Sequence, residues 1–407
     1  CTTGSSAYEH IGRTMNTFCS ALFNSIRKDN DFRIRPCCVF NPEVDHYTVE
    51  DYINSEYIGY LKLKMQQGTA IEECNTCWQR EKHGLTSHRH LYNQYMLGAK
   101  IVPDAIIAKA QSVITHADVK IGNRCNFACA MCHPGDSSLI HNRFAANPDN
   151  EFVQDYTRAY PHYMDVKTNT RFRNESLDYL RYVAADPNIR TIKILGGEPF
   201  VEREFIDTFA HLPEERKRKL SLYITTNGSF DLVEQCEVLG AFRNIFFTVS
   251  LEGVGAVQEY IRKRSSWTQI ERNILRFRDA GLANRHLSIH HTLQALSLPG
   301  LGALIDWLVQ HDLQCTYHLL TRPEYLSVEL LDTDYRQELL EFDLQNTNQF
   351  WGDDIAMSGD IQGYALSKPY RAELASRFLR YIDFYEQDHT LTLEQCAPGL
   401  RERISTV

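Results

Sequence analysis

The sequence predicts an α/β fold built on a parallel sheet. Six apolar, strand-like runs alternate with amphipathic, helix-like stretches between about residues 111 and 321. The stretches between the runs are long enough for the crossover helices that parallel neighbouring strands require. Such a sheet is either doubly wound or an incomplete α/β barrel. In both cases a functional site is expected at the carboxyl ends of the strands.

Each expected element follows from its local pattern. The predicted strands cover residues 112–121, 190–196, 220–226, 244–251, 286–293 and 315–321. The predicted helices between them include residues 202–211, 231–240, 268–280 and 299–310. The long connection 136–174 is either a functional lid or a plain surface insertion. Helical stretches within 330–395 are expected to pack beside the sheet.

Length and composition indicate a globular protein of more than one domain. With 407 residues, 43% of them hydrophobic, the chain has ample material for a core. Residues 1–100 lack the strand–helix alternation, so we predict a small domain there, a larger one over 101–328 and a helical extension over 329–407. The net charge of −9 argues against nucleic acid as a partner. Neither a membrane-spanning run nor a signal peptide is evident, so we expect a cytoplasmic protein without a membrane partner.

The distribution of cysteines indicates metal binding. Nine of the 12 cysteines fall in the first third of the chain. In a reducing compartment, clustered cysteines bind metal more often than they form disulfides.

The stretch RCNFACAMCHPG (124–135) places Cys125, Cys129 and Cys132 in one loop directly after the first predicted strand. A structural zinc site usually has four protein ligands. A [4Fe-4S] cluster held by three thiolates instead leaves one iron open to an external ligand. The spacing therefore favours an iron–sulfur site that also binds a substrate or cofactor. The alternatives are a zinc site completed by His133, or cysteines packed in the core.

This loop resembles the signature of the radical S-adenosylmethionine (SAM) superfamily. Similar motifs end the next three predicted strands: LGGEP (195–199), TTNG (225–228) and SLEGVG (250–255). The resemblance covers about half of the chain and implies a partial (β/α)6 barrel with a [4Fe-4S] cluster on the three cysteines. It also implies that the open iron binds SAM, which is cleaved to a 5′-deoxyadenosyl radical that takes a hydrogen atom from a substrate.

The resemblance further assigns a set of residues to SAM binding: Gly196, Gly197, Glu198, Thr226, Asn227, Ser250, Glu252 and Arg262. The glycines would allow close backbone approach, and Glu198 would accept a hydrogen bond from the SAM ammonium group. Ser250 and Glu252 would lie near the ribose hydroxyls, although the family usually has Asp at the position of Glu252. Arg262 would pair with the SAM carboxylate; its alternative is a solvated helix charge.

Five further cysteines form a second group near the N-terminus: Cys19, Cys37, Cys38, Cys74 and Cys77. Their arrangement resembles the auxiliary-cluster modules called SPASM and twitch, although those usually follow the radical SAM domain. The resemblance implies a second [4Fe-4S] cluster on Cys19, Cys37, Cys74 and Cys77, with Cys38 as a substitute for Cys37. One such cluster implies the twitch type, with a role in electron relay or substrate placement. A four-cysteine zinc knot is the alternative.

The substrate is less clearly indicated. Relatives with these modules most often act on ribosomally made peptides, and otherwise on sugars, nucleosides or aminoglycosides. We therefore expect epimerisation, cross-linking or dehydrogenation of a peptide, with a small-molecule substrate as the alternative. The implied electron donor is of the flavodoxin or ferredoxin type. Competing hypotheses are a non-catalytic iron–sulfur carrier and a zinc-stapled structural protein.

Several residues beyond these motifs are candidates for the reaction cavity. Cys315, at the start of the sixth predicted strand, is a candidate hydrogen donor, and burial as a small apolar side chain is its alternative. One of the strand histidines His290, His291 and His318 is a candidate acid, base or polar anchor, again with packing as the alternative.

Overall fold

A computed structural model describes residues 17–29, 32–82, 87–98, 113–340, 362–363 and 365–405. Residue 112 of the first predicted strand and residues 341–361 of the predicted C-terminal extension lie outside these ranges. The chain divides into two compact units. One comprises residues 1–120 and 186–192, and the other comprises residues 121–185 and 193–407.

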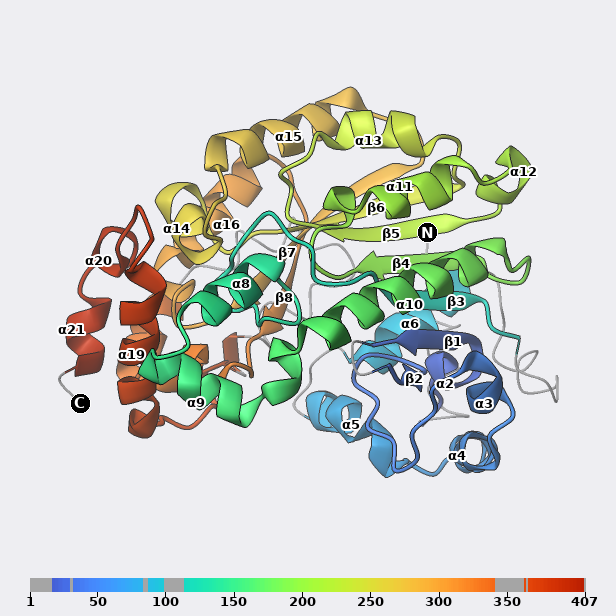
Figure 1. Cartoon of the computed structure of the whole chain (residues 1–407), viewed down its shortest axis with the longest axis horizontal. Coiled ribbons are helices and arrows are strands. Elements are labelled where there is room, and N and C mark those ends of the chain that lie inside the picture. The colour runs from blue at the N-terminus through green and yellow to red at the C-terminus, as the bar shows by residue number, and fades with distance from the viewer. Residues whose placement is uncertain are drawn as a thin grey trace, which may run out of the picture. The chain divides into compact units, whose positions relative to one another are not determined.

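The first unit is built on a small sheet with flanking helices (Figure 1). Its strands are β1 (Ser25–Lys28), β2 (Ile34–Arg35) and β3 (His116–Lys120), in the order β2-β1-β3. β1 runs antiparallel to β2 and parallel to β3. The helices are α2 (Ser20–Asn24), α3 (Val49–Ile53), α4 (Glu56–Gln66), η1 (Glu72–Cys74), α5 (Asn75–Lys82) and α6 (His88–Gly98). The sequence predicts β3 but not β1 and β2, which are too short for apolar alternation to reveal.

A buried ion-pair network joins β1 to β3. Arg27 lies opposite Asp118 in the register of these strands, and its Nη1 is 2.7 Å from Asp118 Oδ2. Its Nη2 is 2.6 Å from Asp29 Oδ1. All three residues are buried. Because a buried charge without a partner is costly, this network favours the one register that keeps Arg27 and Asp118 opposite each other.

The second unit contains parallel strands alternating with helices. The strands are β4 (Thr191–Leu195), which begins in the first unit, β5 (Ser221–Thr226), β6 (Asn244–Ser250), β7 (Arg285–Leu293) and β8 (Cys315–Leu319). They are ordered β4-β5-β6-β7-β8, and the pairs from β5 to β8 are parallel.

The helices of the second unit fill the connections between these strands and the C-terminal region. They are α8 (Ser138–Ala146), α9 (Glu151–Ala159), η2 (Pro161–Met164), α10 (Val166–Ala185), η3 (Pro199–Val201), α11 (Arg203–Ala210), α12 (Glu214–Lys217), α13 (Leu232–Leu239), α14 (Gly255–Ile261), α15 (Trp267–Ala280), η4 (Leu298–Gly300), α16 (Leu301–Gln310), η5 (Glu324–Leu326), η6 (Val328–Leu330), α17 (Thr333–Leu340), η9 (Ala372–Leu374), α19 (Ala375–Glu386), α20 (Leu393–Cys396) and α21 (Leu400–Ser405).

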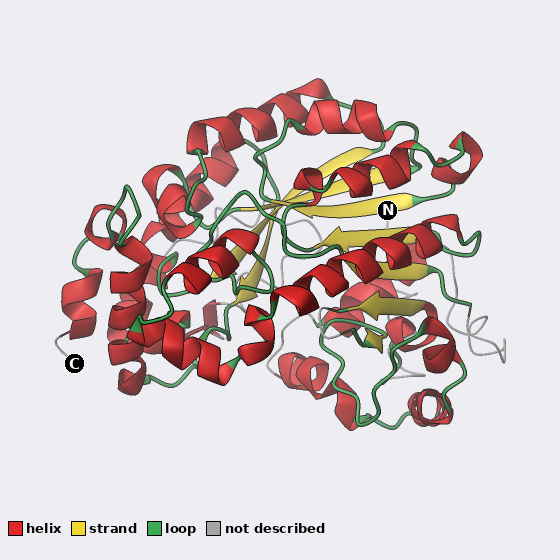
Figure 2. Ribbon diagram, in the orientation of Figure 1, coloured by secondary structure: helices red, strands yellow, loops and turns green. Residues whose placement is uncertain are grey.

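The two faces of this sheet differ in how they are covered. On one face Phe247 is fully buried and packs edge-on against Phe277 of α15, while α11, α13 and α15 lie side by side along the sheet (Figure 2). On the other face Tyr223, Phe246 and His286 stand in register across β5, β6 and β7. Their rings stack with centroid distances of 4.3 and 4.4 Å. Helix packing on one face and this row of stacked rings on the other both support the register of β5, β6 and β7.

The predicted α/β fold is confirmed, and β3 to β8 are the six predicted strands. The arrangement agrees with a partial barrel, and the described C-terminal region is helical. The connection 136–174 is not an open loop, because it contains α8, α9 and the start of α10. The domain limits at residues 100 and 328 stay a prediction. In the part of the chain that the structure describes, every helix is too short or too polar to cross a membrane.

Replacing Asp118 by Asn tests the buried network in the first unit. The substitution leaves Arg27 facing a neutral group, so we expect the free energy of unfolding to fall by about 3 kcal/mol. Urea unfolding at neutral pH, followed by circular dichroism, measures this loss. The matched control is Asp45→Asn, which breaks the exposed pair Arg33–Asp45 and should cost less than about 1 kcal/mol. Equal losses in the two variants would contradict the role assigned to the network.

Candidate active site

The start of the cysteine loop is bonded to the glycines that follow β4. The Gly197 N–H donates to Gly122 O (2.9 Å), and the Glu198 N–H donates to Arg124 O (2.8 Å). A Cβ atom on Gly197 would lie 2.1 Å from Arg124 O, and Gly196 has a φ of +140° that other residues rarely adopt. The close backbone approach predicted for these glycines is therefore an approach to the start of the cysteine loop.

The middle of the cysteine loop is held by a second backbone segment. The Ala128 N–H donates to Lys263 O (3.0 Å), and the Ala130 N–H donates to Ile261 O (2.8 Å). Both acceptors belong to the turn that ends α14. The loop therefore has fixed backbone partners between its cysteines as well as at its start.

Two tyrosines of α19 complete this support. The Tyr381 hydroxyl donates to Ala130 O (2.6 Å), and the Tyr385 hydroxyl lies 3.3 Å from Ala128 O. Both side chains are buried. Helix α19 thus contacts the cysteine loop directly, a role that its sequence pattern does not reveal.

The three thiols are free and lie in a charged, mostly buried environment. Cys129 is buried, whereas Cys125 and Cys132 are half-buried. The pKa of Cys129 lies below its ordinary value, because Cys132 forms a hydrogen bond with it and the Arg262 guanidinium stands beside it. Arg262 Nη1 is 3.7 Å from Cys129 Sγ. Three free thiols on one loop beside a fixed cation fit the donor set of an iron–sulfur cluster.

His133 does not join the thiols as a fourth ligand. Its Nδ1 accepts a hydrogen bond from the Gly135 N–H (3.1 Å), and its Nε2 lies 2.9 Å from Asp136 Oδ2. The ring also stacks on Tyr163, with a centroid distance of 4.0 Å. Both ring nitrogens are therefore engaged within the turn, which disfavours the zinc site considered from the sequence.

Glu198 is buried at the carboxyl end of β4 and binds the end of β5. Its Oε1 accepts from the Thr226 hydroxyl (2.9 Å), and its Oε2 accepts from the Asn227 N–H (2.7 Å). Burial raises the pKa of Glu198 to about 7, although these hydrogen bonds and Arg262 oppose the rise. Contact of Glu198, Thr226 and Asn227 with SAM stays a prediction.

Glu252 and Arg262 form a buried ion pair. Arg262 Nη2 lies 2.7 Å from Glu252 Oε1, and Glu252 Oε2 accepts from the Thr292 N–H (3.0 Å). Burial raises the pKa of Glu252 to about 7, against the lowering effect of Arg262. The Nε of Arg262 is buried and has no hydrogen-bond partner among the described residues. Glu252 thus orients Arg262 and leaves it one donor for a further ligand. Proximity of Ser250 and Glu252 to a ribose stays a prediction.

A closed set of hydrogen bonds links the cysteine loop to the end of β5. Asn227 Nδ2 donates to Asn126 Oδ1 (2.8 Å), and Asn126 Nδ2 donates to Ser229 Oγ (2.9 Å). The Ser229 hydroxyl in turn donates to Asn227 Oδ1 (2.6 Å). Sequence reasoning missed Asn126 and Ser229. Their places, inside the cysteine spacing and directly after TTNG, were the available signal.

Cys315 lies on the helix-covered face of the sheet. Strand register aligns it with Ile289, Val249 and Thr226 in turn. Residues aligned in this way point to the same side, and Val249 and Ile289 are fully buried. Cys315 itself is buried, with its thiol 3.6 Å from Thr316 O. This position favours packing, and the hydrogen-donor role stays a prediction.

Two of the three candidate histidines, His290 and His318, lie on the opposite face of the sheet. His290 Nδ1 is 2.9 Å from the Thr316 hydroxyl, and its ring lies near that of His318. Burial lowers the pKa of His290 to about 3, and the neighbouring His318 adds to this effect. His291 is fully buried on the covered face, where its Nδ1 is 3.0 Å from Leu251 O. His290 and His318 therefore lie on the face away from Cys315 and His291, and a contact of either with a ligand stays a prediction.

The N-terminal cysteines are gathered in the first unit: Cys19 caps α2, Cys37 follows β2, Cys74 ends η1 and Cys77 lies in α5. All four are buried, and burial raises the pKa of each thiol. Cys37 interacts electrostatically with Cys38 first and then with Cys19 and Cys74, and Cys19 interacts with Cys77. The four thiols therefore lie near one another.

Cys38 differs from these four. It is half-buried, and its Sγ lies 3.9 Å from His88 Nδ1. Among the described residues no three His, Cys, Asp or Glu side chains are arranged to hold one metal ion. The thiolates of a four-iron cluster bind different irons, and so they lie further apart than the ligands of a single ion.

Comparison with known proteins gives one family match. Residues 119–300 match the model of the Radical SAM superfamily. Among solved structures the chain is similar to native anSMEcpe with bound AdoMet, at 13% identity and a TM-score of 0.35, covering 58% of this chain and 61% of that chain. It is also similar to native anSMEcpe with bound AdoMet and Kp18Cys peptide, at 17% identity and a TM-score of 0.38, covering 58% and 63%. The chain thus spans about three fifths of these structures. No curated protein matches it.

The matched segment contains the cysteine loop and all three strand-end motifs. The match supports the superfamily and SAM-dependent radical chemistry, for which that family implies a [4Fe-4S] cluster and SAM. The family match therefore supports an enzyme.

Replacing Gly197 by Ala tests the contact between this glycine and the cysteine loop. A methyl group there meets the backbone of Arg124, which cannot move aside like a flexible side chain. We expect a loss of about 3 kcal/mol in the free energy of unfolding, measured by thermal or urea unfolding. Gly59→Ala is the control, since Gly59 is exposed in α4 with no atom near its added methyl group. That change should stabilise the chain by about 0.5–1 kcal/mol. Unchanged stability in Gly197→Ala would show that the loop is packed differently.

The Glu252→Gln variant tests the buried carboxyl through the pH dependence of stability. Because the pKa of Glu252 is raised from 4.5 to about 7, the unfolded chain loses this proton before the folded chain does as pH rises. This group therefore lowers the free energy of unfolding between about pH 4.5 and 7, by up to about 3 kcal/mol. Urea unfolding at several pH values should show that this decline is smaller in Glu252→Gln. Glu237→Gln, at an exposed carboxyl of α13, is the control. If the free energy of unfolding depended on pH in the same way in wild type and Glu252→Gln, the raised pKa assigned to Glu252 would be wrong.

Proposed function

We propose that the chain reductively cleaves SAM to methionine and a 5′-deoxyadenosyl radical, and that this radical abstracts hydrogen from a ribosomally made peptide. The observation that carries the proposal is the cysteine loop itself. Three free thiols are spaced on a rigidly bonded loop beside Arg262, with no fourth protein ligand from His133. Cys125, Cys129 and Cys132 would hold a [4Fe-4S] cluster, which would supply an electron and one open iron for SAM.

Arg262 and Glu198 are the residues that we propose bind and orient the amino-acid end of SAM. The buried Nε of Arg262 has no partner among the described residues, so it is a donor aimed at an acceptor such as the SAM carboxylate. Glu198 Oε2 accepts one hydrogen bond, from Asn227, and has capacity for a second from the SAM ammonium. Glu252 keeps Arg262 charged and in place.

We also propose that Cys19, Cys37, Cys74 and Cys77 hold an auxiliary [4Fe-4S] cluster of the twitch type. Their shared burial and mutual electrostatic effect support this set. The contact between Cys38 and His88 supports Cys37, and not Cys38, as the ligand. The resemblance to twitch modules is also what supports a peptide as the substrate, since enzymes with these modules most often modify peptides.

Anaerobic reconstitution tests the proposed chemistry. The wild-type chain should bind about eight irons and, with dithionite and SAM, release 5′-deoxyadenosine. The triple variant Cys125→Ala, Cys129→Ala and Cys132→Ala should keep about four irons and release none. Cys236→Ala, at a buried cysteine of α13 outside both groups, is the matched control and should behave as wild type. Release of 5′-deoxyadenosine by the triple variant would falsify the proposal, and zinc in place of iron would favour the structural alternative.

Mass spectrometry of candidate peptides then identifies the outcome. Epimerisation leaves the mass unchanged and incorporates deuterium from heavy water, whereas dehydrogenation or cross-linking removes a pair of hydrogen atoms. Turnover of sugars, nucleosides or aminoglycosides without any change in peptides would contradict the peptide assignment.

A further inference from the structure

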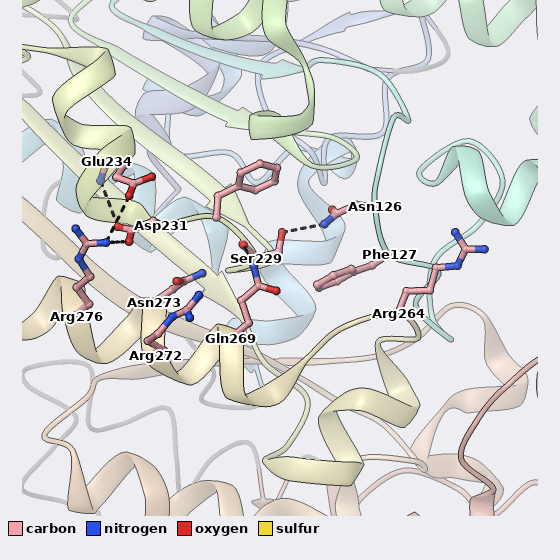
Figure 3. A pocket seen from close by; sticks show the side chains of 11 residues that line it. Asn126, Phe127, Ser229, Asp231, Glu234, Arg264, Gln269, Arg272, Asn273 and Arg276 are labelled. Carbon is pink, nitrogen blue, oxygen red and sulfur yellow. Dashed lines mark hydrogen bonds and ion pairs between the residues drawn. The ribbon is translucent and has the colours of Figure 1, made fainter.

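A polar pocket of about 660 Å³ opens beside the cysteine loop (Figure 3). It lies among the cysteine loop, the segment after β5, the start of α13, the turn before α15 and α15 itself. Its lining residues include Asn126, Phe127, Ser229, Arg264, Arg272 and Arg276. Asn126 and Phe127 stand between Cys125 and Cys129 in the chain. A molecule in this pocket therefore touches the backbone that carries the thiols.

The pocket lining carries more positively than negatively charged side chains. Arg276 is ion-paired with both acidic residues of the lining, Asp231 and Glu234. Arg264 and Arg272 are exposed, and neither forms an ion pair with any residue that the structure describes. With three arginines and two acidic residues, the pocket lining is net positive, although the whole chain has a formal net charge of −9.

Arg264 is held in place by the segment that supports the cysteine loop. Its φ of 74° lies in the left-handed region, which is uncommon for a residue other than glycine. Ile261 O and Lys263 O, just before it, accept hydrogen bonds from the cysteine loop. Figure 3 shows Arg264 at the Phe127 end of the pocket and Arg276 at the far end. A strained backbone that persists at such a place is typical of a functional site.

We propose that this pocket is the docking site of an acidic one-electron donor protein, an inference that rests on the proposed function. Cys129 is buried and Cys125 and Cys132 are half-buried, so a donor protein that docks beside the loop would lie close to all three thiols. Asn126 and Phe127 connect the pocket to that loop. Local positive charge attracts an acidic partner that the net charge of the chain otherwise repels. In the transfer one electron leaves the donor and one enters the site, without bond making or proton transfer.

The test compares reduction by an acidic flavodoxin with reduction by dithionite. It uses the reconstituted wild-type chain, the double variant Arg264→Gln with Arg272→Gln, and the control Arg243→Gln. Arg243 is likewise exposed and without an ion pair among the described residues, but it lies before the first residue of β6, at the other end of the strands. Bleaching of the cluster absorbance measures reduction without SAM turnover, and calorimetry measures flavodoxin binding.

We expect the flavodoxin-driven rate of the double variant to fall about tenfold, with a matching rise in Kd and a weaker dependence on salt. Dithionite reduction and the Arg243→Gln control should equal wild type. Equal flavodoxin rates in the double variant and wild type would overturn the docking site, and so would an equal loss in Arg243→Gln. A parallel loss with dithionite would also overturn it, because the arginines would then act on the cysteine loop itself.

Two further outcomes separate this inference from the function on which it rests. If the wild-type chain cleaves SAM with dithionite while the arginine substitutions have no effect with flavodoxin, only the docking site fails. If the wild-type chain binds no iron or releases no 5′-deoxyadenosine, both fail. Binding of inorganic phosphate that requires Arg264 and Arg272, together with an unchanged flavodoxin rate, would identify a small-anion site and overturn docking.

Discussion

The backbone of the cysteine loop is hydrogen-bonded along its length, and the candidate active site depends on these bonds. Its start is bonded to Gly197 and Glu198, and its middle to the turn at residues 261–263. Two buried tyrosine hydroxyls of α19 reach its carbonyls from a third element. These partners come from three separate parts of the chain. These tertiary hydrogen bonds therefore hold the backbone that carries the thiols.

The hydrogen bonds of the cysteine loop also explain how the charged groups of the site contact one another in series. Arg262 is placed by the turn that bonds the loop, so its guanidinium reaches Cys129 on one side and Glu252 on the other. Glu252 is in turn bonded to the Thr292 N–H. A buried ion pair is stable only when its remaining groups are satisfied. Among the residues that the structure describes, Arg262 Nε is the atom of this pair without a hydrogen-bond partner.

Strands and motifs that depend on local sequence patterns could be predicted from the sequence. Strands β3 to β8 follow from apolar runs, and the polar motifs at their ends converge because the carboxyl ends of parallel strands share one edge. The sequence does not reveal the short strands β1 and β2, and the pairing of β1 with β3 brings Arg27 against Asp118, which lies far along the chain. Likewise, nothing in the helical pattern of residues 375–386 distinguishes tyrosines that pack from tyrosines that bond to a loop some 250 positions earlier.

Tyr385 shows how closely the C-terminal region is integrated into the site. Its hydroxyl lies 3.3 Å from Ala128 O, 2.8 Å from Tyr260 O and 3.1 Å from Ile261 O, although it has one proton to donate. The hydroxyl therefore lies within hydrogen-bond distance of both the cysteine loop and the turn that supports it. Lys263 extends the link by donating to Tyr385 O (3.1 Å). The cysteine loop, the turn and α19 thus form one hydrogen-bonded unit, and α19 is a structural part of the candidate active site.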